Sequence, residues 1–348
     1  MRIAIVTSKA TSLINVAKDI AYVIQRKHYT PRIFTRLMDY YDLDELSDAL
    51  IIVFPSSPLW CMPYYLLYRD YKIHVGKPCL FYTMIEGKPV KRLWKYWMVR
   101  DVEVVTCSKY VAEKLQEVGM TIVDIIPHGL VKEQVIEAMK FIPTVRECLK
   151  ELHGDKVIFG VVAHSHPRKG LQFLAEAVRI LSQKRDDFVV HVITDDKGRE
   201  KLQGIKNIDV DTVFGQRPRE EILAFMGSCH YVIIPSLCEG FCLPLIEANA
   251  MGTPVIHCAY PPLTEISDPK INFTFLYDKL MVRDIGDGIE YEFHVYHPKK
   301  LAQMMDYCIE LVKREDEEYF KRRKWARIVM ERFNAEVHYS KLLEYLIG

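Results

Sequence analysis

The residues best placed to do chemistry are two glutamates, Glu239 and Glu247, which stand on either side of the predicted start of a helix. Residues 231–234 form a short β-branched apolar run that predicts a buried strand, and Pro244 suits the first turn of the helix that follows. The loop between them therefore lies at the carboxyl end of a parallel strand, where open α/β sheets bind ligands. One carboxylate can reach the reacting end of a ligand while the other holds a second part of it. The plainer interpretation is an exposed loop glutamate and a first-turn glutamate stabilised by the helix dipole.

A basic pair, Arg168 and Lys169, lies between a predicted strand at residues 156–163 and a predicted helix at residues 171–183. Strand, cationic loop and helix N-terminus together predict an anion site. A helix end stabilises an anion by only about 0.3–1 kcal/mol, whereas micromolar affinity requires about 8 kcal/mol. The two cations must therefore contribute if this loop binds a phosphate group. The alternative is a solvated basic loop.

Length and charge limit the class of protein. The chain has 348 residues, of which 49% are hydrophobic, so it can form two domains with large cores. A formal net charge of +1 does not indicate any class of binding partner. The first half is the more basic, because residues 1–150 hold 21 Lys and Arg against 16 Asp and Glu. An anionic partner is therefore expected on that half.

Cysteine usage and hydropathy predict a compartment. Nine cysteines are scattered without a C-x-x-C pair, which indicates reduced, mostly buried thiols. Met1 leads directly into a strand pattern, and the apolar run at residues 49–68 contains three prolines. We therefore expect no signal peptide and no membrane span, and a cytoplasmic protein that could be peripheral to a membrane.

The string Glu239-Gly240-Phe241-Cys242-Leu243-Pro244-Leu245-Ile246-Glu247 resembles the signature of glycosyltransferase family 4, the group 1 glycosyl transferases. These are retaining, nucleotide-sugar-dependent enzymes of the GT-B fold. The resemblance implies that Glu239 contacts the transferred sugar and that Glu247 binds the nucleotide ribose. It also implies that the loop amides of Gly240, Phe241, Cys242 and Leu243 touch the sugar and the diphosphate.

The same resemblance implies binding roles for further residues. The Arg168-Lys169-Gly170 run is similar to the diphosphate clamp of the family, and Gly215 stands near the place where relatives seat the base. Relatives often have another arginine just after the strand at residues 156–163. Here Ala163 or His164 stands near that place, and His164 or His166 could partly replace its charge. The family usually has a glycine pair where this chain has residues 8–11.

Glu86 follows the predicted strand at residues 79–84, where many relatives have a histidine close to the sugar. A carboxylate facing the cleft could take a proton from an acceptor hydroxyl. A surface turn residue is the other interpretation. We assign Glu86 to the catalytic set together with Glu239, Arg168 and Lys169.

Two segments of the first half combine aromatic and basic residues, at residues 58–71 and 88–100. Such segments suit a phospholipid surface, and a solvated helix with a buried aromatic stripe is the alternative. The hypothesis is weak membrane-surface contact and a lipid-linked or membrane-proximal acceptor. Nucleic acid is not expected as a partner.

The predicted fold is α/β: two doubly wound Rossmann-like domains facing across a cleft, with a C-terminal helix crossing back to the first domain. The predicted units are residues 1–145 on the acceptor side, residues 155–315 for the nucleotide sugar, and the returning helix at residues 316–348. Residues 144–155 are expected to be the linker, and residues 272–292 show no regular pattern.

The expected reaction transfers a sugar from a nucleotide-diphosphate donor to an acceptor hydroxyl with retention of configuration. No cofactor beyond this co-substrate and no metal are expected, because Asp195-Asp196 lacks the D-x-D spacing that holds Mn²⁺ in many other glycosyltransferases. A nucleotide-sugar epimerase on the same fold and an inactive nucleotide-sugar-binding module are the alternatives.

Overall fold

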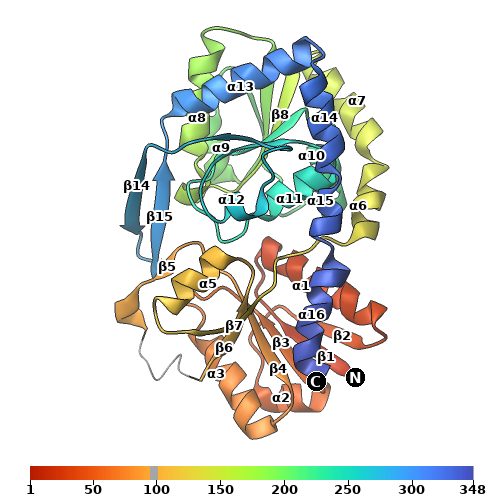
Figure 1. Ribbon diagram of the computed structural model, residues 1–348, viewed down its shortest axis with the longest axis vertical. Helices are drawn as coiled ribbons and strands as arrows, with labels where there is room; N and C mark the ends of the chain where they lie inside the picture. Colours follow the sequence, from red (N-terminus) through yellow and green to blue (C-terminus); the bar gives the residue numbers. More distant parts are fainter. Residues whose placement is uncertain (95–100, 348) are drawn as a thin grey trace.

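The protein consists of two α/β domains stacked one above the other, each built on a parallel sheet with helices packed around it (Figure 1). The computed structural model describes residues 1–94 and 101–347. The first sheet has the strand order β2-β1-β3-β4-β6-β7, and the second has the order β10-β9-β8-β11-β12-β13. The predicted α/β fold with two doubly wound domains is confirmed.

The first domain alternates strands and helices. Its strands are β1 (Arg2–Val6), β2 (Thr30–Phe34), β3 (Ala49–Val53), β4 (Cys79–Thr83), β5 (Lys88–Pro89), β6 (Glu103–Thr106) and β7 (Thr121–Ile125). Its helical segments are α1 (Thr11–Arg26), α2 (Tyr40–Leu46), α3 (Met62–Asp70), η1 (Tyr71–Val75), η2 (Lys91–Leu93) and α5 (Lys109–Gln116). Helices α6 (Lys132–Met139) and α7 (Ile142–His153) lead into the second domain.

The second domain repeats this alternation. Its strands are β8 (Val157–Val162), β9 (Phe188–Ile193), β10 (Ile208–Asp211), β11 (Tyr231–Ile234), β12 (Val255–Cys258), β13 (Phe273–Phe275), β14 (Lys279–Asp284) and β15 (Ile289–Val295). Its helical segments are η3 (Pro167–Lys169), α8 (Leu171–Ser182), α9 (Asp196–Leu202), α10 (Arg219–Ser228), α11 (Leu243–Ala250), α12 (Leu263–Ile266) and α13 (Pro298–Lys313).

The central strands are apolar along their whole length. Every residue of β3 (ALIIV) and of β9 (FVVHVI) is buried. A parallel sheet covered by helices requires such runs, because both of its faces lie in the core. Strand β2 is less buried and contains Pro31, which is tolerated because β2 lies at the edge of its sheet.

The order of the second sheet creates a crevice between β8 and β11. These strands are neighbours, with Tyr231 in register with Phe159, but their connections continue toward opposite edges of the sheet. The loops that follow them therefore separate at the carboxyl ends of the strands, which is where doubly wound folds bind ligands. The loop after β8 carries Arg168 and Lys169, and the loop after β11 carries Glu239.

The C-terminal segment returns to the first domain, as predicted. Helices α14 (Glu317–Ala326) and α15 (Val329–Arg332) run down the second domain, and α16 (Ala335–Ile347) lies on the first, against α1 and β4 (Figure 1). The backbone N–H of Gly129 donates to the Tyr339 hydroxyl at 3.1 Å. The expected single helix is thus three helices in succession.

Two expectations about the connections are wrong. Residues 144–155, expected to be the linker, form most of α7, which packs against α10. Residues 272–292 contain β13, β14 and the start of β15. Strand β15 pairs in antiparallel fashion with β14 and also with β5 of the first domain, with Glu290 opposite Lys88. The hairpin of β14 and β15 is therefore a strap between the domains. Local sequence does not reveal the strap, because β5, the strand it pairs with in the first domain, is distant in the chain.

None of the helices in the described ranges, residues 1–94 and 101–347, combines the length and the apolar character that a membrane crossing needs.

Candidate active site

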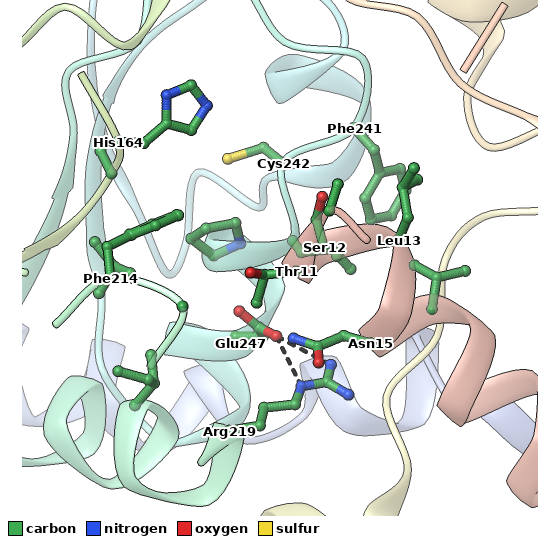
Figure 2. A pocket seen from close by; sticks show the side chains of 18 of the residues that line it. Thr11, Ser12, Leu13, Asn15, His164, Phe214, Arg219, Phe241, Cys242 and Glu247 are labelled. Atoms are coloured by element: carbon green, nitrogen blue, oxygen red, sulfur yellow. Dashed lines mark hydrogen bonds and ion pairs between the residues drawn. The ribbon is translucent and has the colours of Figure 1, made fainter. Parts of the chain in front are cut away.

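A cavity of about 490 Å³ lies between the two domains. The first domain contributes the start of α1, the loop after β4 and His128, while the second contributes the loops after β8 and β11, α10 and α11. Figure 2 shows side chains of α1 facing Cys242 and Glu247 across it. The predicted site residues that line this central cavity are Glu86, His164, Arg168, Lys169, Gly215, Glu239, Gly240, Phe241, Cys242, Leu243 and Glu247.

The catalytic set predicted from the sequence forms one ionic cluster. The two carboxylate oxygens of Glu239 accept from Arg168 Nη1 at 2.9 Å and from Lys169 Nζ at 2.5 Å. Arg168 Nη2 donates to Glu86 Oε1 at 2.8 Å. Glu86 is therefore not a free surface turn residue, because it joins the first domain to the basic loop of the second.

Burial makes this cluster electrostatically strong. Glu239 is only 4% exposed. Burial alone would raise the pKa of Glu239, but the neighbouring Lys169 and Arg168 charges lower it to about 2. Burial opposes the charge of Arg168, yet Glu86 and Glu239 raise its pKa above the ordinary value. Glu239 and Arg168 are therefore both charged at neutral pH.

Close backbone contacts hold the two loops in place. A Cβ at Gly170, where φ is +67°, would lie 2.0 Å from the carbonyl oxygen of Pro235. A Cβ at Gly240 would lie 2.6 Å from the carbonyl oxygen of Ile85 in the first domain. Glycine is needed at both positions because any side chain would separate these chain segments. Gly240 thus brings its loop against the other domain.

The start of α11 carries local strain. Cys242 has a φ of 84°, which is unusual for a residue with a side chain and is tolerated where the surroundings enforce it. Pro244 occupies the first turn of α11, as predicted, and that turn contains no acidic residue. Burial raises the pKa of the Cys242 thiol, so this cysteine is protonated.

Glu247 belongs to a second ionic bridge. Its Oε1 accepts from Arg219 Nη2 at 3.0 Å, and Arg219 Nη1 donates to Asp19 of α1 at 2.7 Å (Figure 2 shows the Glu247 contact). Asp19 is 1% exposed, and burial raises its pKa to about 6 despite the opposing Arg219 charge. Arg219 therefore links Glu247 to the first domain.

One wall of the cavity is aromatic. The rings of His164 and Phe214 meet edge to face with centroids 5.8 Å apart, and Gly215 lies against Thr11 of α1. Burial, with Arg168 and Lys169 close by, lowers the pKa of His164 to about 4. His164 is therefore neutral at pH 7 and does not replace the charge of the arginine found in relatives.

Sequence reasoning missed Asp19, Arg219 and His128. Two of them carried a signal: Asp19 lies on the apolar side of α1, and Arg219 is a cation at a helix N-terminus, where the dipole disfavours it. Each position implies a buried partner of opposite charge. His128 lies against Phe241 and shares a 2.9 Å hydrogen bond with the Tyr82 hydroxyl, and its burial lowers its pKa to about 3.

Other predicted features have structural roles. Asp195 caps α9 by accepting from the Gly198 N–H at 2.7 Å. In the segment at residues 58–71 the tyrosines are buried in the first domain, while Leu59, Trp60 and Leu66 are exposed. In the segment at residues 88–100, Trp94 is buried, and residues 95–100 lie outside the described residues. Membrane contact stays a prediction. All nine cysteines are free thiols.

The lowered pKa of Glu239 predicts a pH dependence of stability. A folded pKa of about 2, against an ordinary value of 4.5, means that the carboxylate stabilises the fold above pH 4.5 and loses this contribution as the pH falls toward 2. The difference in unfolding free energy between wild type and Glu239→Gln should shrink by about 2 kcal/mol between pH 7 and pH 3. Urea unfolding at several pH values measures it.

The matched control is Glu176→Gln on α8, where the side chain is 52% exposed and pairs with Arg179 at 3.4 Å. Its stability difference from wild type should stay nearly constant over the same range. A constant difference for Glu239→Gln as well would show that its carboxylate is not held by Arg168 and Lys169.

Comparison with known proteins agrees with this arrangement. The family model for glycosyl transferases, group 1, matches residues 149–304. An uncharacterized glycosyltransferase of Sulfolobus islandicus rod-shaped virus 1 is 28% identical over 348 residues, covering 99% of this chain and 100% of the relative.

Solved structures share the fold along the whole chain. A glycosyltransferase from Rickettsia africae ESF-5 is similar with a TM-score of 0.69 and 18% identity, covering 99% of this chain and 97% of the other. The Anabaena protein Alr3699/HepE in complex with UDP-glucose is similar with a TM-score of 0.68 and 13% identity, covering 99% of each chain. Residues 149–304 are thus similar to the group 1 glycosyl transferases, and the two domains together have the GT-B fold of these solved glycosyltransferases.

Proposed function

We propose that this protein transfers a sugar from a nucleotide-diphosphate donor to an acceptor hydroxyl, with retention of anomeric configuration and without a metal at the reaction centre. The observation that carries the proposal is the buried cluster of Arg168, Lys169 and Glu239, which faces the central cavity at the crevice between β8 and β11. The complex of the Anabaena neighbour with UDP-glucose supports a nucleotide sugar as the ligand of this fold.

The diphosphate would be bound by cations and amides. Arg168 and Lys169 are already held on the cavity wall by Glu239, so little side-chain entropy is lost when they bind phosphate oxygens. The amides at the start of α11, which has no acidic residue in its first turn, would add donors for the same oxygens. As the bond to the sugar breaks, negative charge grows on the leaving phosphate, and these groups stabilise it.

The nucleoside would lie against the second domain. Glu247 lines the cavity from α11 and is oriented by Arg219, so its second oxygen can accept from ribose hydroxyls. The base would lie by the wall formed by His164, Phe214 and Gly215. A neutral His164 suits this place, because an uncharged ring can pack against a base without desolvating a charge.

The acceptor would approach from the first domain. Glu86 is the carboxylate that the loop after β4 brings to the cavity, within 2.8 Å of Arg168. It would receive the proton of an acceptor hydroxyl, and the leaving phosphate would be a second base. Closure of the two domains around the donor would expel water, which otherwise competes as the acceptor.

Loss of the Lys169 charge tests the phosphate site. Lys169→Ala should lower turnover by about 10²–10³-fold, because it removes a cation aimed at the leaving phosphate. Purified protein is incubated with UDP-, GDP- or ADP-sugars and candidate acceptors, and released nucleoside diphosphate and transferred sugar are measured. Lys184→Ala, at an exposed position beyond the end of α8, is the control and should keep wild-type turnover. Near-normal turnover of Lys169→Ala would rule out the clamp.

Replacement of Glu247 separates binding from chemistry. Glu247→Ala should raise the donor KM at least about tenfold with a smaller change in kcat, because ribose contacts are made equally in the ground and transition states. Arg219 keeps Asp19 as its partner, so the fold should persist. Initial rates over a range of donor concentrations measure both constants, and Glu176→Ala serves as the control. A fall in kcat at unchanged KM would contradict the ribose role.

Product analysis tests the stereochemistry and the metal independence. The anomeric configuration of the first product formed, followed by NMR, should match that of the donor, and EDTA should leave the initial rate unchanged. Inversion would refute the retaining mechanism. Conversion of the donor sugar into its epimer without acceptor would instead identify an epimerase.

A further inference from the structure

A group of metal-ligating side chains lies apart from the residues that line the central cavity. His153 ends α7, His191 lies on β9, and Asp209 lies on the edge strand β10. Their potential ligand atoms all lie within 4.8 Å of one another. Because the three residues come from three separate elements, no spacing motif in the sequence marks them.

The distances within the group form a nearly regular triangle. His153 Nε2 lies 3.1 Å from His191 Nδ1, and Asp209 Oδ2 lies 3.6 Å from the first nitrogen and 3.3 Å from the second. Zinc bonds to imidazole nitrogen and carboxylate oxygen are about 2.0–2.2 Å long, so two ligands of a tetrahedral ion lie about 3.3–3.6 Å apart. Two of the three observed distances fall within this range, and the His153–His191 distance of 3.1 Å is slightly shorter.

Hydrogen bonds within the group of His153, His191 and Asp209 do not give every polar atom a good partner. One proton between the two imidazoles can serve their 3.1 Å contact, but the Asp209 oxygen lies beyond the usual range for a hydrogen bond to either nitrogen. Neutral imidazole is the protonation state that metals bind.

The surroundings also suit a cation. His153 and His191 are nearly buried, with side chains 9% and 11% exposed, while the Asp209 side chain is 47% exposed and leaves an open side for a water ligand. Arg217, a cation close to His191, is paired with Asp211 at 2.7 Å. Lys156, close to His153, lies 3.6 Å from Asp186. The neighbouring positive charges thus have partners of their own.

We propose that His153, His191 and Asp209 bind a zinc ion, with water as the fourth ligand. The ligand set of two imidazoles and one carboxylate is one that zinc accepts. The ion would fasten the end of α7 to β9 and to β10, the edge of the second sheet. The site is independent of the proposed transfer reaction, since none of its ligands lines the cavity.

Zinc binding to the full-length chain is the test. Metal-free protein, kept reduced with a phosphine, is titrated with zinc by equilibrium dialysis, and its melting temperature is followed with and without zinc. Wild type should bind one zinc per chain and melt about 3–8 °C higher when zinc is a hundredfold above Kd. His153→Gln and Asp209→Asn should each bind zinc at least tenfold more weakly and lose most of the shift.

Two control variants show where the zinc binds. His74→Gln, at an exposed position in the first domain, and Cys148→Ser, at an exposed free thiol, should bind zinc as wild type does. Metal-free His153→Gln and Asp209→Asn should keep the circular dichroism spectrum of metal-free wild type. With Co²⁺ in place of zinc, a visible spectrum without thiolate charge-transfer bands should appear in wild type and be absent from Asp209→Asn.

The proposal is overturned if wild type binds no zinc. It is also overturned if the double variant of His153 and Asp209 binds zinc as wild type does, or if the cobalt spectrum shows thiolate ligation. Donor binding at 25 °C should be the same before and after removal of the metal, which keeps this test separate from that of the transferase reaction.

Discussion

The structure of the site depends on the pairing of buried opposite charges. Glu239 is almost inaccessible to water, and a buried carboxylate is costly unless cations and hydrogen-bond donors surround it. Arg168 and Lys169 provide them, which requires the loops after β8 and β11 to pack backbone to backbone through Gly170. Because these strands are neighbours at the crevice of the sheet, the cluster stands where a ligand can reach it.

The same constraint joins the two domains. Arg168 reaches Glu86, and Arg219 reaches Asp19, so each glutamate assigned to the donor shares its cation with a carboxylate of the first domain. In the proposed function, a diphosphate competes with Glu86 and Glu239 for the cations, so donor binding and the contacts between domains share the same side chains. Removing one partner of such a buried ion pair is expected to lower the free energy of unfolding by about 3–5 kcal/mol.

Further contacts hold the two domains together. The strap formed by β14 and β15 pairs with β5, and α16 lies against α1 and β4. The Ser108 hydroxyl donates to the Gly240 carbonyl at 2.8 Å, and Glu265 accepts from the N–H groups of Lys109 and Tyr110. These bonds surround the cavity with fixed backbone, which suits a site that must hold reacting groups in place.

The sequence by itself determined the alternation of strands and helices outside residues 272–292, and the loops that carry Glu239, Glu247, Arg168 and Lys169. Apolar runs and turn residues are local signals, and the signature around Glu239 is local as well. Only the tertiary structure decided which charges meet: that Glu86 binds Arg168, that Arg219 joins Glu247 to Asp19, and that His164 is neutral. It also decided that residues 279–295 form a strap, and that His153, His191 and Asp209 converge. Partners of this kind are far apart in the chain, and burial, which sets their charge states, exists only after folding.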